Sequence, residues 1–194
     1  MSEAGEKARL RAVLLKGRRA LGPEDVQARG ARVQARLLAT PEFQKAQTVA
    51  LYAALPGEVP TDAAFAAALA AGKTVAFPVV PTVGRCLRFY RVDALSQLVP
   101  AGRLRIREPA EGRPVVSLQS IELFVVPGLG FSKAGHRLGQ GAGYYDATLA
   151  LAPASTPRVG LAFSEQLLQE LPKGPWDVPM HQVLTEEAAF SAGP

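Results

Sequence analysis

The residues best suited to chemistry lie between positions 128 and 146, where six glycines surround Arg137 and precede Asp146. Glycine lets backbone amides approach an anion closely, and an arginine can fork onto phosphate oxygens. A carboxylate beside a phosphate indicates a bound Mg²⁺ between the two anions, because Mg²⁺ is usually bound by one or two carboxylates together with phosphate oxygens. The segment therefore predicts a nucleotide phosphate site. The alternative is a structural glycine turn in which Arg137 pairs with Asp146, and the spacing matches neither the P-loop nor the dinucleotide fingerprint.

The elements on either side of this segment indicate how it is held. Residues 121–126 form an apolar run, interrupted by Glu122, that ends at Pro127, which predicts a buried strand near the centre of a sheet. Tyr144, Tyr145, Asp146 and Leu149 follow at helical spacing and predict the start of a helix. A strand, a glycine-rich loop and a helix in this order present backbone amides to a phosphate group.

Apolar patterning along the rest of the chain alternates between helices and strands. We expect helices at 7–21, 22–38 and 61–71, with shorter ones from 40 and at 164–171, and strands at 48–55, 74–80, 87–92 and 158–163. A strand, a helix and a further strand in succession predict a right-handed crossover and a parallel sheet. The expected fold is therefore α/β, a three-layer α/β/α arrangement around a mostly parallel central sheet, in one domain spanning residues 1–194.

Three further charged residues stand where they can reach the same site. Lys7 and Arg11 are four residues apart, so they share one face of the first helix at the edge of its apolar stripe. Glu58 follows the expected strand 48–55, and ligands of open α/β sheets bind beyond the carboxyl ends of strands. Each observation has an ordinary alternative, because a basic pair can form a solvated helix face and Glu58 can be a loop acid.

Composition narrows the class of partner. The formal net charge is +5, but the basic residues are dispersed without interleaved aromatics, so we expect anionic small molecules and no nucleic acid. A single cysteine excludes an internal disulfide and a cysteine-based zinc site. No apolar run approaches the roughly 20 residues of a membrane helix, and charges interrupt the N-terminal segment. We therefore expect a cytoplasmic protein with no membrane association, as a monomer or weak oligomer.

Two blocks, PGLGF at 127–131 and GHRLGQGAGYYD at 135–146, resemble the signature of the 5-formyltetrahydrofolate cyclo-ligases, also called 5,10-methenyltetrahydrofolate synthetases. KARLR at 7–11 resembles the N-terminal KxxxR of the family, and VLTE at 183–186 resembles its closing VxTE. The likeness extends over nearly the whole chain, and its central motif is long and specific.

The resemblance implies an enzyme that converts 5-formyltetrahydrofolate to 5,10-methenyltetrahydrofolate, with ATP as co-substrate, Mg²⁺ as cofactor, and ADP and phosphate as the other products. It implies that the formyl oxygen is phosphorylated before N10 closes the ring, so that positioning and charge neutralisation replace a protein nucleophile. Catalysis is implied for Arg137 and Lys7, and Mg²⁺ binding for Asp146 and Asp177. The implied folate contacts are Ala53, Leu55, Glu58 and Tyr144. The implied ATP contacts are Lys7, Arg11, Arg137, Leu138, Gly139, Gln140, Gly141, Ala142, Gly143, Tyr144 and Tyr145.

Four positions depart from the family pattern. Ser132, Glu122 and His181 stand where the family has aspartate, and Arg105 replaces a glycine. Because Mg²⁺ prefers oxygen ligands, we expect His181 to be structural. The departures leave open the hypothesis that the chain is a nucleotide-binding module of the same fold without cyclo-ligase activity. The intact motifs and Asp177 argue against that hypothesis. A basic RNA-binding protein is a third hypothesis, which predicts a steep salt dependence of RNA affinity.

Overall fold

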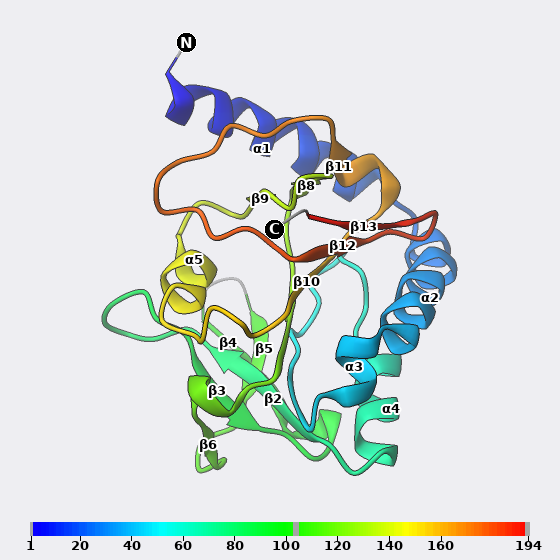
Figure 1. The fold of residues 1–194 in the computed structure, drawn as a ribbon, viewed down its shortest axis with the longest axis vertical. Coiled ribbons are helices and arrows are strands. Elements are labelled where there is room, and N and C mark those ends of the chain that lie inside the picture. The colour runs from blue at the N-terminus through cyan, green and yellow to red at the C-terminus, as the bar shows by residue number, and fades with distance from the viewer. Residues whose placement is uncertain (1, 103–104, 193–194) are drawn as a thin grey trace.

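The structure of the chain is a computed structural model that describes residues 2–102 and 105–192 (Figure 1). The helices are α1 (Glu3–Ala20), α2 (Pro23–Ala39), α3 (Pro41–Lys45), α4 (Asp62–Ala70) and α5 (Tyr144–Leu149), with short 3₁₀ helices η1 (Leu95–Gln97), η2 (Leu118–Ser120) and η3 (Ser164–Gln166). The strands are β1 (Thr48–Ala50), β2 (Thr74–Val79), β3 (Arg88–Arg91), β4 (Leu98–Ala101), β5 (Ile106–Pro109), β6 (Val115–Val116), β7 (Leu123–Val126), β8 (Gly130–Ser132), β9 (Arg137–Leu138), β10 (Arg158–Leu161), β11 (Leu167–Leu168), β12 (Gln182–Leu184) and β13 (Ala189–Ser191).

The large central sheet has the strand order β13-β12-β10-β7-β1-β2-β3-β6. Its inner strands β12, β10, β7, β1 and β2 are mutually parallel, and antiparallel partners are added at both edges. All four residues of β7 are buried, as expected for the central strand of a parallel sheet. The mostly parallel sheet of the predicted α/β fold is therefore confirmed.

Alternate side chains of the sheet face two different layers. Val49, Val75 and Val125 pack with residues of α2, α3 and α4 on one face, where Figure 1 shows these three helices stacked together. Ala50 and Phe124 point to the opposite face, toward a cluster that includes residues of α5 and β8. This period-two division of apolar residues gives the three layers that the sequence predicts.

A small three-stranded sheet, β11-β8-β9, carries helix α1. Leu14 of α1 packs with Leu129, Leu138 and Leu171, which lie in or beside this small sheet. The approach is close at Gly130, where a Cβ atom would lie 2.8 Å from Leu14 Cδ1, so that a larger residue would displace the helix. In Figure 1, α1 runs along the outside of β8, β9 and β11. The N-terminal basic residues are thereby brought to the glycine-rich segment.

Two sequence predictions of local structure, those for residues 48–55 and 164–171, were wrong. The strand expected at 48–55 ends at Ala50, because the chain then turns and Tyr52 bonds to its own loop: its hydroxyl donates to Val59 O (2.8 Å) and its carbonyl accepts from Thr61 Oγ1 (2.7 Å). The helix expected at 164–171 is the single turn η3 followed by β11, which pairs with β8. The glycine-rich loop contains the β8–β9 hairpin, with Arg137 at the start of β9.

No helix within the two described stretches is long and apolar enough to cross a lipid bilayer.

Candidate active site

A cavity of about 450 Å³ opens beyond the carboxyl ends of β2, β1 and β7, the edge at which α/β sheets bind ligands. All sixteen residues that the family resemblance assigns to ATP, folate or Mg²⁺ line it. They come from α1, the segment after β1, β9, the glycine segment, α5 and the loop before β12. The structure therefore brings together residues that are up to 170 positions apart, such as Lys7 and Asp177.

Helix α1 supplies two cations to one end of the cavity. Lys7 Nζ lies 2.7 Å from Asp177 Oδ2 and 2.9 Å from Glu3 Oε1, and Arg11 Nε donates to Gly139 O at 3.0 Å. Burial acts to lower the pKa of Lys7, but its hydrogen bonds to Asp177 and Glu3 raise that pKa above the usual value. The ammonium group is therefore charged at neutral pH, and the solvated-face alternative for this basic pair is wrong.

Arg137 is the third cation and is almost fully buried. Its Nη2 donates to Asp146 Oδ2 at 2.7 Å, its Nη1 is 3.5 Å from Pro127 O, and its guanidinium lies 5.5 Å from the centre of the Tyr145 ring. Within the described residues its Nε has no hydrogen-bond partner. The guanidinium also fills the space beside Gly139, where a Cβ would lie 2.6 Å from Nη1. The pairing with Asp146 considered from sequence is thus present, and it forms on the wall of a cavity while leaving donor capacity unused.

Asp146 and Asp177 meet at the same end of the cavity. The Val178 amide donates to Asp146 Oδ1 at 3.2 Å, so the loop that carries Asp177 is tied directly to α5. Burial acts to raise the pKa of Asp177, but the Gly174 amide and Lys7 lower it below the usual value and keep the carboxylate ionised. Each aspartate is already paired with one cation.

The donor chemistry of this end fits Mg²⁺ bound together with phosphate. Among residues 2–102 and 105–192 no group of three or more histidine, cysteine or acidic side chains is placed to hold a metal ion by itself. Mg²⁺ is usually bound by one or two carboxylates with substrate phosphates and water completing its ligands. Two aspartates beside the glycine-rich segment suit that requirement.

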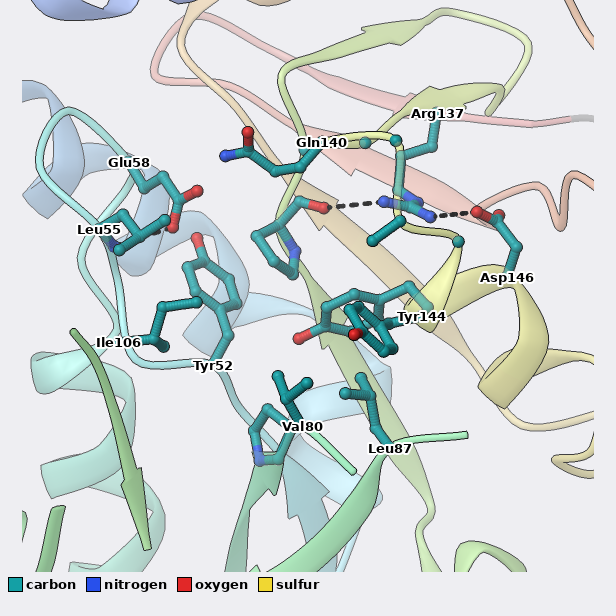
Figure 2. A pocket seen from close by; sticks show the side chains of 18 of the residues that line it. Tyr52, Leu55, Glu58, Val80, Leu87, Ile106, Arg137, Gln140, Tyr144 and Asp146 are labelled. Atoms are coloured by element: carbon teal, nitrogen blue, oxygen red, sulfur yellow. Dashed lines mark hydrogen bonds and ion pairs between the residues drawn. The ribbon is translucent and has the colours of Figure 1, made fainter. Parts of the chain in front are cut away.

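Glu58 stands at the other end of the cavity, where both of its oxygens have partners from the chain itself. Oε1 accepts from Arg18 Nη1 at 2.7 Å and Oε2 accepts from Leu55 N at 2.9 Å. Burial raises the pKa of Glu58 above its usual value, and Arg18 opposes that shift. Each carboxylate oxygen can accept a second hydrogen bond, so acceptor capacity remains for a ligand. Figure 2 shows Glu58 and Leu55 across the cavity from Arg137 and Asp146.

Between the two ends the cavity is largely apolar. Only some of the residues that line this middle part were assigned from the sequence. Val80, Leu87 and Tyr144 lie on one side in Figure 2, and Tyr52 lies below Glu58. The β4–β5 hairpin contributes Ile106 and Glu108, and Glu108 Oε1 accepts from Val80 N at 3.1 Å, which ties the hairpin to the end of β2. Arg105, at the position where the sequence departs from a family glycine, has a φ of 50°.

The other departures from the family pattern lie away from the cavity lining. Ser132 Oγ accepts from His136 N at 3.2 Å in the β8–β9 hairpin, and Glu122 Oε2 accepts from Gln47 N at 2.6 Å before β7. His181 Nδ1 accepts from Arg158 N at 3.1 Å, and burial together with Arg158 lowers its pKa. These contacts are structural, as expected for His181, and they give no support to the idea of a decayed site.

Comparison with known proteins points to one family. Residues 3–186 match the model of the 5-formyltetrahydrofolate cyclo-ligase family. The chain is 36% identical over 171 residues to the 5-formyltetrahydrofolate cyclo-ligase of Escherichia coli K12, covering 87% of this chain and 93% of that protein. It is 27% identical over 194 residues to the mouse enzyme of the same name, covering 95% of this chain and 96% of that protein. The solved structure of Aquifex aeolicus 5,10-methenyltetrahydrofolate synthetase superposes with a TM-score of 0.82 at 32% identity, covering 97% and 93% of the two chains.

Proposed function

Because the chain belongs to the 5-formyltetrahydrofolate cyclo-ligase family, we propose that it cyclises 5-formyltetrahydrofolate to 5,10-methenyltetrahydrofolate while ATP is converted to ADP and phosphate. The observation that carries the proposal is a single cavity with two chemically different ends. Lys7, Arg11 and Arg137 converge on the glycine segment at one end, and Glu58 stands at the other beyond an apolar middle. A triphosphate and a pterin suit these two ends respectively.

The reaction in this proposal has two steps. The formyl oxygen of the folate attacks the γ-phosphorus of ATP, which forms an imidate phosphate on N5 and releases ADP. N10 then attacks the formyl carbon and releases its proton, the carbon–oxygen bond breaks, and inorganic phosphate leaves with that oxygen. An amide oxygen is a poor leaving group until it is phosphorylated, so the chain needs to position the reactants and neutralise charge.

Lys7 and Arg137 are held in place by the carboxylates that pair with them, and Arg11 by its bond to Gly139 O. Arg137 lines the cavity, and its planar fork suits the equatorial oxygens of the transferring phosphoryl group. Lys7 and Arg11 reach the other phosphates from α1, and the backbone of Gly139, Gly141 and Gly143 follows their path. Preorganised cations of this kind stabilise the transition state without being rearranged during the reaction.

Asp146 and Asp177 would hold Mg²⁺, which when bound would neutralise phosphate charge. Their present partners, Arg137 and Lys7, are the groups proposed to contact phosphate. Arrival of magnesium-bound ATP would therefore replace two direct ion pairs by cation–phosphate and carboxylate–metal contacts. Each cation and each carboxylate keeps a partner of opposite charge in this exchange, so none of the four need be left unpaired in a partly buried site.

The folate end is proposed to bind the pterin by hydrogen bonds to Glu58 and by apolar contact. Glu58 is fixed by Arg18 and by Leu55 N, so its free acceptor directions are preorganised for N–H donors of the ring. Ala53 and Leu55 form the wall beside it, and Tyr144 lies between the two ends. The formyl group would then lie toward Arg137, where the phosphoryl group is transferred.

One spectrophotometric experiment tests the proposal. The protein is mixed with ATP, Mg²⁺ and 5-formyltetrahydrofolate, and the methenyl product is followed by its near-ultraviolet absorbance, with each component omitted in turn. The expected result is product only when all three are present. ATP binding without any methenyl product would instead support a nucleotide-binding module and would refute the proposed activity.

A further inference from the structure

Gln166 is a buried polar side chain whose amide N–H groups bond to the backbone behind the phosphate end. It is the last residue of η3 and is 7% exposed. Its Oε1 accepts from Phe163 N at 2.8 Å, while its Nε2 donates to Gly128 O at 3.1 Å and to Leu129 O at 3.0 Å. The side chain therefore joins η3 to the segment that leads from β7 into the glycine-rich region.

The two carbonyls that Gln166 binds lie in a gap between strands. β7 ends at Val126 and β8 begins at Gly130, so residues 127–129 belong to neither strand. The Leu129 amide is bonded on the other side, to Leu138 O at 2.8 Å. Buried carbonyls require hydrogen-bond donors, and a primary amide carries two N–H groups, one for each of these oxygens.

This gap segment forms the wall against which Arg137 lies. A Cβ atom at Gly128 would be 3.3 Å from Arg137 Cγ, and Pro127 O lies 3.5 Å from Arg137 Nη1. Gly128 itself lines the cavity. Because the guanidinium has its one short bond to Asp146, the wall on the opposite side decides how the stem of Arg137 is directed.

We propose that Gln166 is a positioning residue for nucleotide binding, whose amide holds Gly128 and Leu129 so that Arg137 directs its guanidinium toward the ATP phosphates. The inference rests on the proposed function, because it takes ATP as the ligand of Arg137.

The support behind Gln166 is itself fixed by a buried carboxylate. Ser164, the first residue of η3, donates from its amide to Glu186 Oε2 at 3.0 Å and from its hydroxyl to Glu186 Oε1 at 3.1 Å. Arg29 of α2 pairs with Glu186 and with Glu165, and its guanidinium lies 4.9 Å from the centre of the Phe163 ring. A connected set of bonds therefore runs from α2 through Glu186 and η3 to the wall of the phosphate site.

The test compares Gln166→Met with Gln34→Met. Methionine has a similar length and cannot replace the amide hydrogen bonds. Gln34 is a matched control, because it is 5% exposed and its Oε1 accepts from Ala64 N at 3.1 Å between α2 and α4, outside the cavity lining. Binding of ATP with Mg²⁺ and of 5-formyltetrahydrofolate is measured by isothermal titration calorimetry, and thermal unfolding is followed by circular dichroism.

Both variants are expected to melt below the wild type, since each loses buried hydrogen bonds. Gln166→Met alone should weaken ATP binding by about tenfold, equivalent to about 1.4 kcal/mol, and should leave folate affinity unchanged. Equal ATP affinity in Gln166→Met and Gln34→Met would overturn the positioning role, as would an equal loss of ATP and folate affinity. Wild-type protein that fails to bind ATP would instead refute the proposed function.

Gln166→Glu provides an independent readout if the methionine variant does not fold. An ionised glutamate keeps the acceptor for Phe163 N but has no donor for the two carbonyls, whereas the protonated acid supplies one donor. ATP affinity relative to the wild type should therefore improve as the pH is lowered, and Gln34→Glu should show no such trend. If the ratio of the ATP affinity of Gln166→Glu to that of the wild type did not change with pH, the proposal would be overturned.

Discussion

Replacing Arg137 by alanine should reduce turnover far more than it reduces stability. The variant leaves Asp146 without its cation, but that carboxylate is 21% exposed and keeps its bond from the Val178 amide. The cost should therefore be about 1–2 kcal/mol, less than the roughly 3–5 kcal/mol for breaking a fully buried pair. By contrast, a preorganised donor aimed at developing charge contributes about 10²–10³-fold to kcat, or about 2.7–4 kcal/mol. The two magnitudes differ enough to be separated by experiment.

The assay for this variant measures methenyl product formation well below the melting temperature, alongside a circular dichroism melt. Arg91→Ala is the matched control, because Arg91 is half exposed and pairs with Asp93 outside the cavity lining, so kcat should not change. Arg137→Lys should fall between the wild type and alanine, because lysine retains the charge and lacks the planar fork. If Arg137→Ala kept near wild-type kcat while melting a few degrees lower, Arg137 would be a structural partner of Asp146 and the reasoning would be refuted.

Three further predictions test separate parts of the site. Asp146→Asn and Asp177→Asn should each raise the Mg²⁺ concentration needed for half-maximal activity, whereas Asp93→Asn should not; unchanged magnesium titrations would contradict the metal assignment. Burial raises the pKa of Glu58, so the native state binds this proton more tightly than the unfolded chain does. Its contribution to the free energy of unfolding is therefore fully present below the unfolded pKa of about 4.3 and is lost as the pH rises through the raised pKa. In urea titrations over that window Glu58→Gln should show a flatter pH dependence than the wild type, and equal slopes would argue against a raised pKa. Arg105→Gly should raise the free energy of unfolding by up to about 1 kcal/mol, because Arg105 is strained in the left-handed region and glycine is not. The gain is limited because glycine also adds entropy to the unfolded chain. A lower urea midpoint for the variant would rule out strain at this position.

The parts of the site that the sequence predicted are those encoded by local spacing. Lys7 and Arg11 share a helix face because they are four residues apart, and α1 does present both to the cavity. The glycine segment follows a buried strand and precedes Tyr144, so its place at the carboxyl edge of the sheet follows from the order of elements. The meeting of Asp146 with Asp177 needed the family resemblance, because their separation along the chain carries no information about contact.

The parts that were missed depend on contacts between distant segments. Arg18 was not identified as the partner of Glu58, although it lies four residues after Leu14 and so continues the buried face of α1. Ile106 and Glu108 line the cavity because the β4–β5 hairpin bonds to the residue after β2, and no local sequence pattern encodes that contact. The segment 164–171 is apolar at helical spacing, but Gln166 bonds back to Phe163 and Leu167 pairs with β8, so tertiary contacts override the local preference.

Helix α1 connects the two ends of the cavity more directly than any other element considered above. Lys7 and Arg11 reach the phosphate end, and Arg18 holds Glu58 at the folate end. Eleven residues of helix separate Lys7 from Arg18, a length of about 16 Å at about 1.5 Å per residue. Leu14 lies between them and packs closely against Gly130, where a Cβ atom would be 2.8 Å from Leu14 Cδ1. If a ligand shifted α1 as a unit through Lys7, it would also shift Arg18 and the carboxylate that Arg18 fixes. If the chain binds both ligands as proposed, any free-energy coupling between them is reciprocal, and folate binding changes ATP affinity by the same factor by which ATP changes folate affinity.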